Sequence, residues 1–140
     1  RRLPRGVAVS FLLDTDICSR YLRQPSKLFH RFIQHAGRLH VSAVGLSELY
    51  TWGYKQDDPS RIVSAIADLR RAVGVLPFDE SCAETLGQIR GVQLRQGVSY
   101  ASIDLLIAAT ALVHDLTLVT HNTKDFQRIP NLRTADWLED

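Results

Sequence analysis

Hydrophobic residues along this chain form two kinds of pattern, short continuous apolar runs and longer segments with helical spacing. Continuous runs are typical of strands that are buried on both faces, as in a parallel sheet covered by helices. They predict strands at 7–13, 38–41, 74–77, 116–120 and, at an edge, 132–134. Apolar positions repeating every three to four residues predict helices at 17–22, 27–35, 43–55, 61–72, 80–95 and 103–114.

Strands that alternate with helices predict an α/β fold with a mostly parallel central sheet. The length of 140 residues fits a single domain, 1–140, with residues 1–6 read as a trimmed or engineered end without function. The segment 43–72 holds more helix than one crossover between strands requires. We therefore expect it to form a helical hairpin that protrudes from the sheet.

Capping residues predict where several of these helices begin and end. The expected N-caps are Asp16, Ser26, Ser42, Ser60 and Ser102, and the expected helix-ending glycines are Gly37 and Gly97. The predicted apolar faces include Leu28, Phe29, Phe32 and Ile33 in one helix and Leu86, Ile89 and Leu94 in another. The polar segment 121–128 is expected to be an irregular excursion after a strand.

Composition changes this picture little. The chain is 45% hydrophobic and 23% charged, with a formal net charge of +2, which excludes neither nucleic acid nor a small substrate as partner. Cys18 and Cys82 lack CxxC spacing, which argues against a disulfide scaffold or a zinc site and favours a reducing compartment such as the cytoplasm. No run approaches the roughly 20 apolar residues that span a membrane, and the start lacks the apolar core of a signal peptide.

Acidic and amide side chains recur at the ends of the predicted elements. These candidate site residues are Asp14, Glu48, Asp104, Asn122 and Asp125. In a parallel sheet the carboxyl ends of the strands share one edge, which is where ligands bind in such folds. The residues after the strands would converge there, and the acid of helix 103–114 would join them if that helix begins at the same edge.

Such a cluster favours a metal site. Mg²⁺ and Mn²⁺ prefer carboxylate and water oxygens, and clustered carboxylates without a cation repel one another. One or two ions held by three or four acids would hold a water, lower its pKa and position a phosphate for in-line attack. Each acid also has an ordinary interpretation, because Asp14 can cap a helix, Glu48 can lie on a solvated helix face and Asp104 suits a helix N-terminus.

Other catalytic motifs are missing from the sequence. The five histidines show no HxxxH spacing, no serine lies in a GxSxG context, and neither GxGxxG nor a Walker A motif occurs. Cys18 is interpreted as a small buried residue rather than a nucleophile. His121 is the one histidine close enough to the candidate site to keep in reserve.

Four segments in order resemble a known family. They are LLDTDI at 12–17, SELY at 47–50, IDLLIAATAL at 103–112 and LVTHNTKDF at 118–126. Together they are similar to the PIN domain family, and in particular to the VapC-type toxin ribonucleases of toxin–antitoxin modules. The resemblance implies a three-layer α/β/α sandwich whose acidic pocket binds Mg²⁺ or Mn²⁺ and whose substrate is RNA.

The resemblance also assigns residue roles. Asp14, Glu48 and Asp104 would be the metal ligands, and Asn122 or the nearby carboxylate of Asp125 would take the fourth position. Two threonines, Thr15 and Thr120, would support the site by hydrogen bonding. The first motif commonly reads DTN, so Asp16 is a departure that adds an acid at the rim.

Partners follow from the resemblance as well. It implies a homodimer inhibited by an antitoxin whose C-terminal segment lies in a hydrophobic groove. The hairpin 43–72 carries a largely aromatic group, Leu49, Tyr50, Trp52 and Tyr54, which fits that groove, the core or a dimer interface. Candidate RNA-binding arginines are Arg20, Arg23, Arg31, Arg38, Arg90 and Arg95.

Two alternatives remain open at the level of sequence. LLDTDI also resembles the DxD signature of haloacid-dehalogenase-type phosphatases, in which the first aspartate is phosphorylated. The second alternative is a PIN-like module that binds a partner without catalysis. All three strong acids are present, which favours the nuclease over the inert module.

Overall fold

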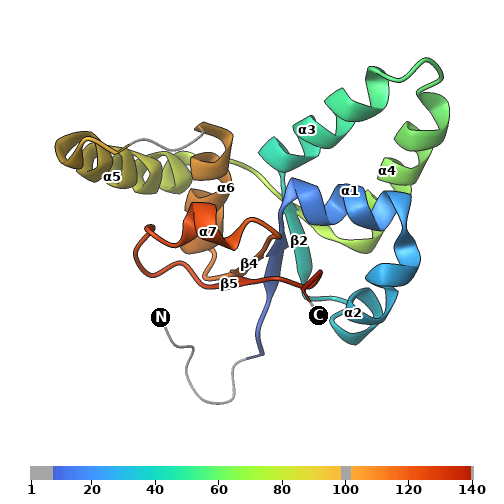
Figure 1. The fold of residues 1–140 in the computed structure, drawn as a ribbon, viewed down its shortest axis with the longest axis horizontal. Helices are drawn as coiled ribbons and strands as arrows, with labels where there is room; N and C mark the ends of the chain where they lie inside the picture. Colours follow the sequence, from blue (N-terminus) through green and yellow to red (C-terminus); the bar gives the residue numbers. More distant parts are fainter. Residues whose placement is uncertain (1–7, 99–101, 140) are drawn as a thin grey trace.

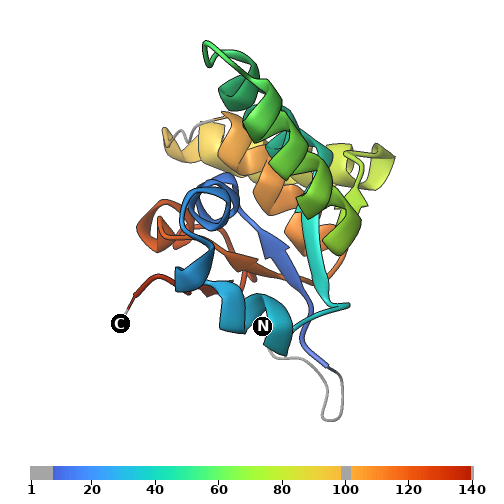
Figure 2. The same ribbon diagram turned by 90° about the vertical axis from the view of Figure 1, so that its right-hand side faces the viewer.

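The computed structural model describes residues 8–98 and 102–139, which form a five-stranded sheet between two layers of helices (Figures 1 and 2). The strands are β1 (Phe11–Leu13), β2 (Leu39–Ser42), β3 (Gly74–Leu76), β4 (Thr117–Val119) and β5 (Thr134–Ala135). All neighbouring pairs are parallel, in the order β3-β2-β1-β4-β5. The predicted α/β/α sandwich with a parallel sheet is confirmed, including the edge position of the last strand.

Helices connect and cover the strands. They are α1 (Thr15–Arg23), the 3₁₀ turn η1 (Pro25–Lys27), α2 (Phe29–Gln34), α3 (Ala43–Tyr54), α4 (Ser60–Ala72), α5 (Glu80–Gln96), α6 (Ser102–Val113) and α7 (Thr123–Phe126). Helices α3 and α4 stand out from the body of the molecule as the expected hairpin (Figure 1). None of the described helices combines the length and apolar character that crossing a membrane requires.

Successive side chains of the central strand β1 belong to two separate hydrophobic cores. Phe11 and Leu13 belong to a cluster with side chains of α1 to α4, whereas Leu12, between them, packs with α6 and β4. Successive side chains of a strand point to opposite faces, so one strand serves both helical layers. The continuous apolar run of β1 is explained by burial on both sides.

Several predicted boundaries and caps are wrong. Residues 8–10 are not strand, because β2 begins its pairing with β1 only at the Phe11–Leu39 pair, and Val7 lies outside the described residues. Asp14 caps α1, since its carboxylate accepts from the Thr15 backbone N–H, so Asp16 lies inside the helix. Two other predicted caps, Ser26 and Ser60, lie within η1 and at the first position of α4.

The other predicted helix ends agree with the structure only in part. The Ser42 side chain caps α3 by accepting from the Gly45 N–H at 2.8 Å, and Gly97 ends α5 with a φ of +69°, both as predicted. Ser102 is the first residue of α6, so the cap position before it lies outside the described residues. The excursion at 121–128 contains the short helix α7.

Three residues predicted to be buried are exposed. Phe29 and Ile33 are 54% and 63% exposed because α2 is short and only Leu28 and Phe32 face the core. Leu94 is 75% exposed near the end of α5. Apolar periodicity therefore overstates the buried face of these two helices.

Candidate active site

The candidate site lies at the carboxyl edge of the sheet, where β1 and β4 end. Asp14 follows β1 directly, and its backbone N–H donates to the Val119 carbonyl at 2.9 Å. In a β–helix–parallel β unit the helix runs against the strands, so α6 begins at this same edge with Asp104 in its first turn. The predicted convergence depends on this topology.

Asp14 is the most buried of the candidate acids, with 6% of its surface exposed. One carboxylate oxygen accepts from the Thr15 backbone N–H at 2.8 Å, and the other accepts from the Thr120 hydroxyl at 2.8 Å. Burial raises the pKa of Asp14 to about 7, with the charges of Asp16 and Asp104 acting in the same direction and the two hydrogen bonds opposing it. The carboxylate is fixed in place but poorly stabilised as an anion.

Glu48 enters the site from α3. It is half-buried, and one of its carboxylate oxygens accepts a hydrogen bond from the Thr15 hydroxyl at 2.6 Å. Because Thr15 also bonds Asp14 through its backbone N–H, a single residue orients both carboxylates. The supporting roles expected of Thr15 and Thr120 correspond to hydrogen bonds in the structure.

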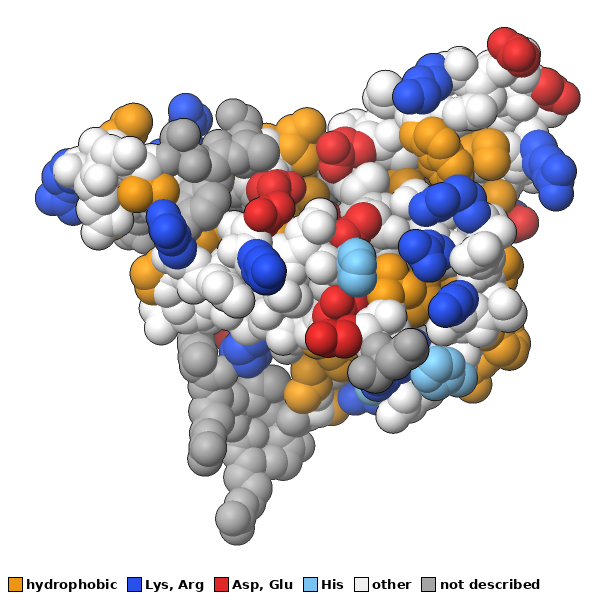
Figure 3. Space-filling model, viewed as in Figure 1, with side chains coloured by type: hydrophobic (Ala, Val, Ile, Leu, Met, Phe, Trp, Pro, Cys, Tyr) orange, Lys and Arg blue, Asp and Glu red, His pale blue; other side chains and the backbone are white. Residues whose placement is uncertain are grey.

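Asp104 is half-buried and faces the same acidic environment. Burial raises its pKa, and the charges of Asp125, Glu48 and Asp16 raise it further. The charges of acids on α1, α3 and α7 therefore act on the acid of α6. Figure 3 shows acidic side chains gathered on this face, with lysine and arginine side chains on both sides of them.

The two candidates for the fourth position are both exposed. The Asn122 backbone N–H donates to the Thr120 hydroxyl at 3.1 Å, and its side chain makes no capping bond to α7. Asp125 lies one turn further on in α7, where its charge acts on Asp104. The charge of Asp125 therefore acts on an acid of the site, whereas Asn122 contacts the site through its backbone.

An unforeseen pair of residues borders the cluster. The exposed imidazole of His121 lies 3.0 Å from an oxygen of Asp136, and the His121 backbone N–H donates to Asp16 at 3.1 Å. His121 stood out in the sequence only by position, and Asp136 gave no signal because its contact depends on the β4–β5 pairing.

The donor set fits a hard divalent cation. All of the clustered side chains offer oxygen, and one oxygen of Asp16 is buried without a hydrogen-bond partner in the described structure. Within residues 8–98 and 102–139, however, no three His, Cys, Asp or Glu side chains stand close enough together to hold an ion.

Other candidate features lie elsewhere. Cys18 is fully buried and burial raises the pKa of its thiol, as expected for a residue that is not a nucleophile. Arg38 lies just before β2, at the opposite edge of the sheet, where it bonds backbone carbonyls, and Arg31 lies over the ring of Trp137. These two arginines serve the fold rather than the acidic face.

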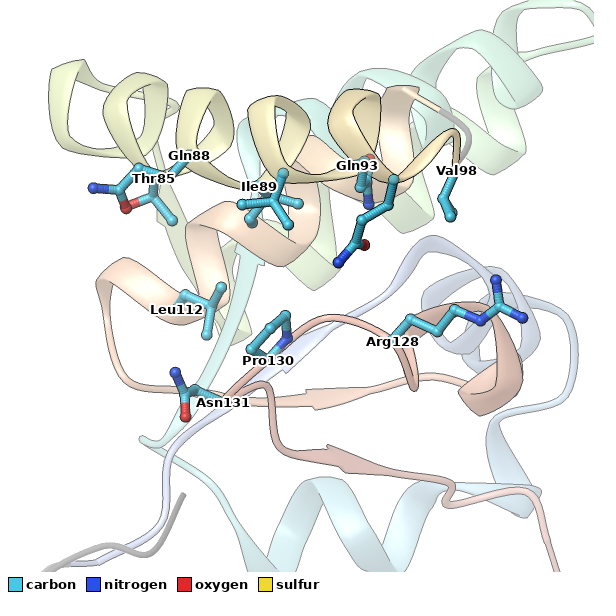
Figure 4. Close-up of a pocket in the computed structure, with 11 residues that line it drawn as sticks. Thr85, Gln88, Ile89, Gln93, Val98, Leu112, Arg128, Pro130 and Asn131 are labelled. Carbon is cyan, nitrogen blue, oxygen red and sulfur yellow. The ribbon is translucent and has the colours of Figure 1, made fainter.

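A hollow of about 420 Å³ lies away from the acids, between α5 and the segment that follows α7 (Figure 4). Amide and apolar side chains line it, with Arg128 as its charged member and no acid among its lining residues. Among its described lining residues there is no Asp, Glu, His or Cys.

Comparison with known proteins identifies a family for this arrangement. The sequence profile described as "PIN domain" matches residues 11–132. The tRNA(fMet)-specific endonuclease VapC of Shigella flexneri is 35% identical over 130 residues, which cover 92% of this chain and 98% of that protein. Ribonuclease VapC2 of Haemophilus influenzae strain Rd is 32% identical over 131 residues, covering 93% and 99%.

Solved structures agree in fold. The toxin–antitoxin complex VapBC of Salmonella typhimurium, crystallised with DNA, contains a chain that superposes with a TM-score of 0.88 at 31% identity and covers 93% of this chain and 99% of that one. VapBC2 of Rickettsia felis, bound to a promoter DNA fragment, gives a TM-score of 0.86 at 27% identity, covering 92% and 99%.

Proposed function

Because this chain belongs to the PIN domain family, and VapC ribonucleases match it over more than nine-tenths of its length, we propose that it is a metal-dependent endoribonuclease, the toxin of a toxin–antitoxin pair. The resemblance to phosphatases with a DxD motif is set aside by this membership. The observation that carries the proposal is the joining of Asp14 and Glu48 by hydrogen bonds to Thr15 at the carboxyl edge of the sheet, where the charge of Asp104 also acts on Asp14.

Asp14, Glu48 and Asp104 would hold the ion, which we propose to be Mg²⁺ or Mn²⁺. Each oxygen of Asp14 keeps a free lone pair beyond its one hydrogen bond, so the existing bonds leave it able to bind a cation. When bound, such an ion polarises a phosphodiester and makes water more acidic. The mutual repulsion of the acids supports this assignment, since a cation would stabilise them together.

Hydrogen bonds from neighbouring residues fix the geometry of the reaction. Thr120 holds Asp14 from β4, and Thr15 holds Glu48 from α1, so neither carboxylate needs to be ordered when RNA arrives. We place Asn122 and Asp125 at the mouth of the site, where an exposed amide or carboxylate can hydrogen-bond a water or a ribose hydroxyl.

The proposed partners are RNA, an antitoxin and a second copy of the chain. The VapBC complexes among the structural relatives support the antitoxin, and the hairpin α3–α4 offers it half-buried Tyr50 and Trp52 and exposed Tyr54. The name of the S. flexneri relative makes tRNA(fMet) the first RNA to test. We propose that the protein acts in the cytoplasm, where tRNA is found and where free thiols such as Cys18 and Cys82 persist.

The test is a cleavage assay with the purified protein, tRNA(fMet), a pool of other RNAs, and Mg²⁺, Mn²⁺ or EDTA. Asp104→Asn removes one charge with little change of shape and is expected to slow cleavage at least about 10- to 100-fold. Asp57→Asn makes the same charge change in the exposed α3–α4 loop and serves as the matched control. Cleavage that survives EDTA, or that Asp104→Asn leaves intact, would refute the proposal.

A further inference from the structure

We propose that a hollow between α1 and α3 holds an unpaired base of the RNA substrate, next to the phosphodiester that is cleaved. The hollow has a volume of about 280 Å³ and is lined by Thr15, Ser19, Arg23, Leu49 and Trp52. The inference rests on the proposed function, because it names the form of RNA that reaches the acids. It makes the substrate a single-stranded or looped RNA rather than a duplex.

Two helices form this hollow. From α1 come Thr15, Ser19 and Arg23, which are spaced four residues apart and therefore lie on one face of the helix. From α3 come Leu49 and Trp52, which are three residues apart and share the face turned toward α1. Leu49 is buried in the hydrophobic core, whereas Trp52 is half-buried, so part of its side chain stays accessible in the hollow.

The hollow adjoins the acidic site through Thr15. The Thr15 hydroxyl donates to Glu48 at 2.6 Å, and the Thr15 backbone N–H donates to Asp14 at 2.8 Å. Arg23 lies at the other end of the hollow, eight residues and therefore about 12 Å further along α1. An RNA strand with one phosphate at the carboxylates would therefore place a neighbouring nucleotide at the hollow.

The lining has the chemistry that binds single-stranded RNA. Unpaired bases stack on aromatic rings and on arginine, and cationic side chains bind the backbone. Trp52 supplies the ring. Among the described residues, the exposed guanidinium of Arg23 donates through Nε alone, to the Ser19 carbonyl at 3.3 Å, which leaves its terminal N–H groups for a phosphate or a base. Beside the acidic side chains, Figure 3 shows a hydrophobic patch with lysine and arginine side chains around it, over α1 and α3.

A segment of a partner protein is the competing occupant. A helix that docks in a groove uses apolar anchors on several successive turns. The apolar lining of this hollow is limited to Leu49 and Trp52, from one turn of α3, and its other lining groups are two hydroxyls and a cation. Its volume lies close to the lower end of the range of small-molecule pockets, roughly 300–1,000 Å³. Size and chemistry therefore favour a single base.

The experiment measures RNA binding by fluorescence anisotropy in EDTA, with a labelled single-stranded oligouridylate and the same oligomer made of abasic nucleotides. Trp52→Ala should weaken binding of oligouridylate by about 5- to 150-fold and leave the weaker binding of the abasic oligomer unchanged. Trp52→Phe should keep most of the affinity, because a smaller ring can still stack. The matched control is Phe29→Ala, which removes another accessible ring, on α2, and should change neither affinity.

Each alternative result overturns the inference. Equal affinity of wild type and Trp52→Ala for oligouridylate would leave the hollow to a protein segment, and an equal loss for both oligomers would show that Trp52 does not contact a base. Wild type that binds neither oligomer would also overturn it. If Trp52→Ala does not fold, Trp52→Leu applies the same test, because it keeps an apolar side chain without a ring.

Failure of the proposed function is distinguishable from failure of this inference. Binding is measured without a metal ion, and cleavage is measured separately with Mg²⁺ or Mn²⁺. Metal-dependent cleavage together with unchanged binding by Trp52→Ala would leave the nuclease and remove the base site. Base-dependent binding through Trp52 without cleavage would do the reverse.

Discussion

The buried carboxylate of Asp14 predicts that the metal-free protein loses stability as the pH rises. An acid whose pKa is higher in the folded state than in the unfolded state binds more protons when folded, so raising the pH between the two values favours unfolding. For Asp14 these values are about 7 and 3.8. At about 1.4 kcal/mol per pKa unit, full ionisation costs the fold about 4 kcal/mol.

The perturbation is Asp14→Asn, which keeps the capping bond to α1 and removes the charge. In EDTA the variant should lie within about 1 kcal/mol of wild type near pH 4, and the difference in free energy of unfolding should grow to about 4 kcal/mol at pH 8. The pKa values of Asp16 and Asp104 are also raised, so their ionisation destabilises the wild type as the pH rises. Without the charge of Asp14 this contribution to the pH dependence of the free energy of unfolding should be smaller.

Urea unfolding at several pH values between 5 and 8 measures the effect. His35, whose pKa is lowered by burial, titrates in this range with the opposite sign, so the informative quantity is the difference between wild type and variant at each pH. Saturating Mn²⁺ should abolish the loss in wild type, because a bound cation favours the ionised acid. A difference that does not grow between pH 5 and pH 8 would refute the reasoning.

Three further substitutions test individual contacts. Thr15→Val removes the hydroxyl that orients Glu48 and should slow RNA cleavage with little loss of stability, whereas Thr15→Ser should retain activity. Ser42→Ala removes the cap of α3 and should lower the free energy of unfolding by about 1 kcal/mol in urea titrations; no loss would contradict the capping bond. Gly97→Ala places a side chain at a φ of +69° and should cost about 1–2 kcal/mol, seen as a lower unfolding temperature.

Sequence patterns predicted which strands and helices this fold contains better than the residues at which each begins and ends. Burial on both faces gives β1 a continuous apolar run that needs no tertiary information to detect. Its first residue could not be predicted, because that depends on where β2 begins to pair. The exposure of Phe29 and Ile33 was missed for a similar reason, since the size of the buried face of α2 depends on what packs against it.

The sequence made it possible to predict the acidic residues at the ends of strands and helices. The contacts between these residues could not be predicted. Parallel strands bring Asp14 and the segment after β4 to one edge, a consequence of topology alone. The bond from Thr15 to Glu48 spans 33 residues, and the pairing of His121 with Asp136 depends on β5 lying beside β4. No local sequence pattern encodes a contact between residues so far apart along the chain.

The hydrogen bond from Thr120 to Asp14 joins residues 106 positions apart, across the pairing of β4 with β1. During synthesis β1, β2 and β3 can assemble first, but Asp14 acquires this partner only after the last third of the chain has been translated. Asp104 arrives at the same late stage. The growing polypeptide therefore has no complete acidic site with which to cut the RNA around it until Asp104 and Thr120 have been made.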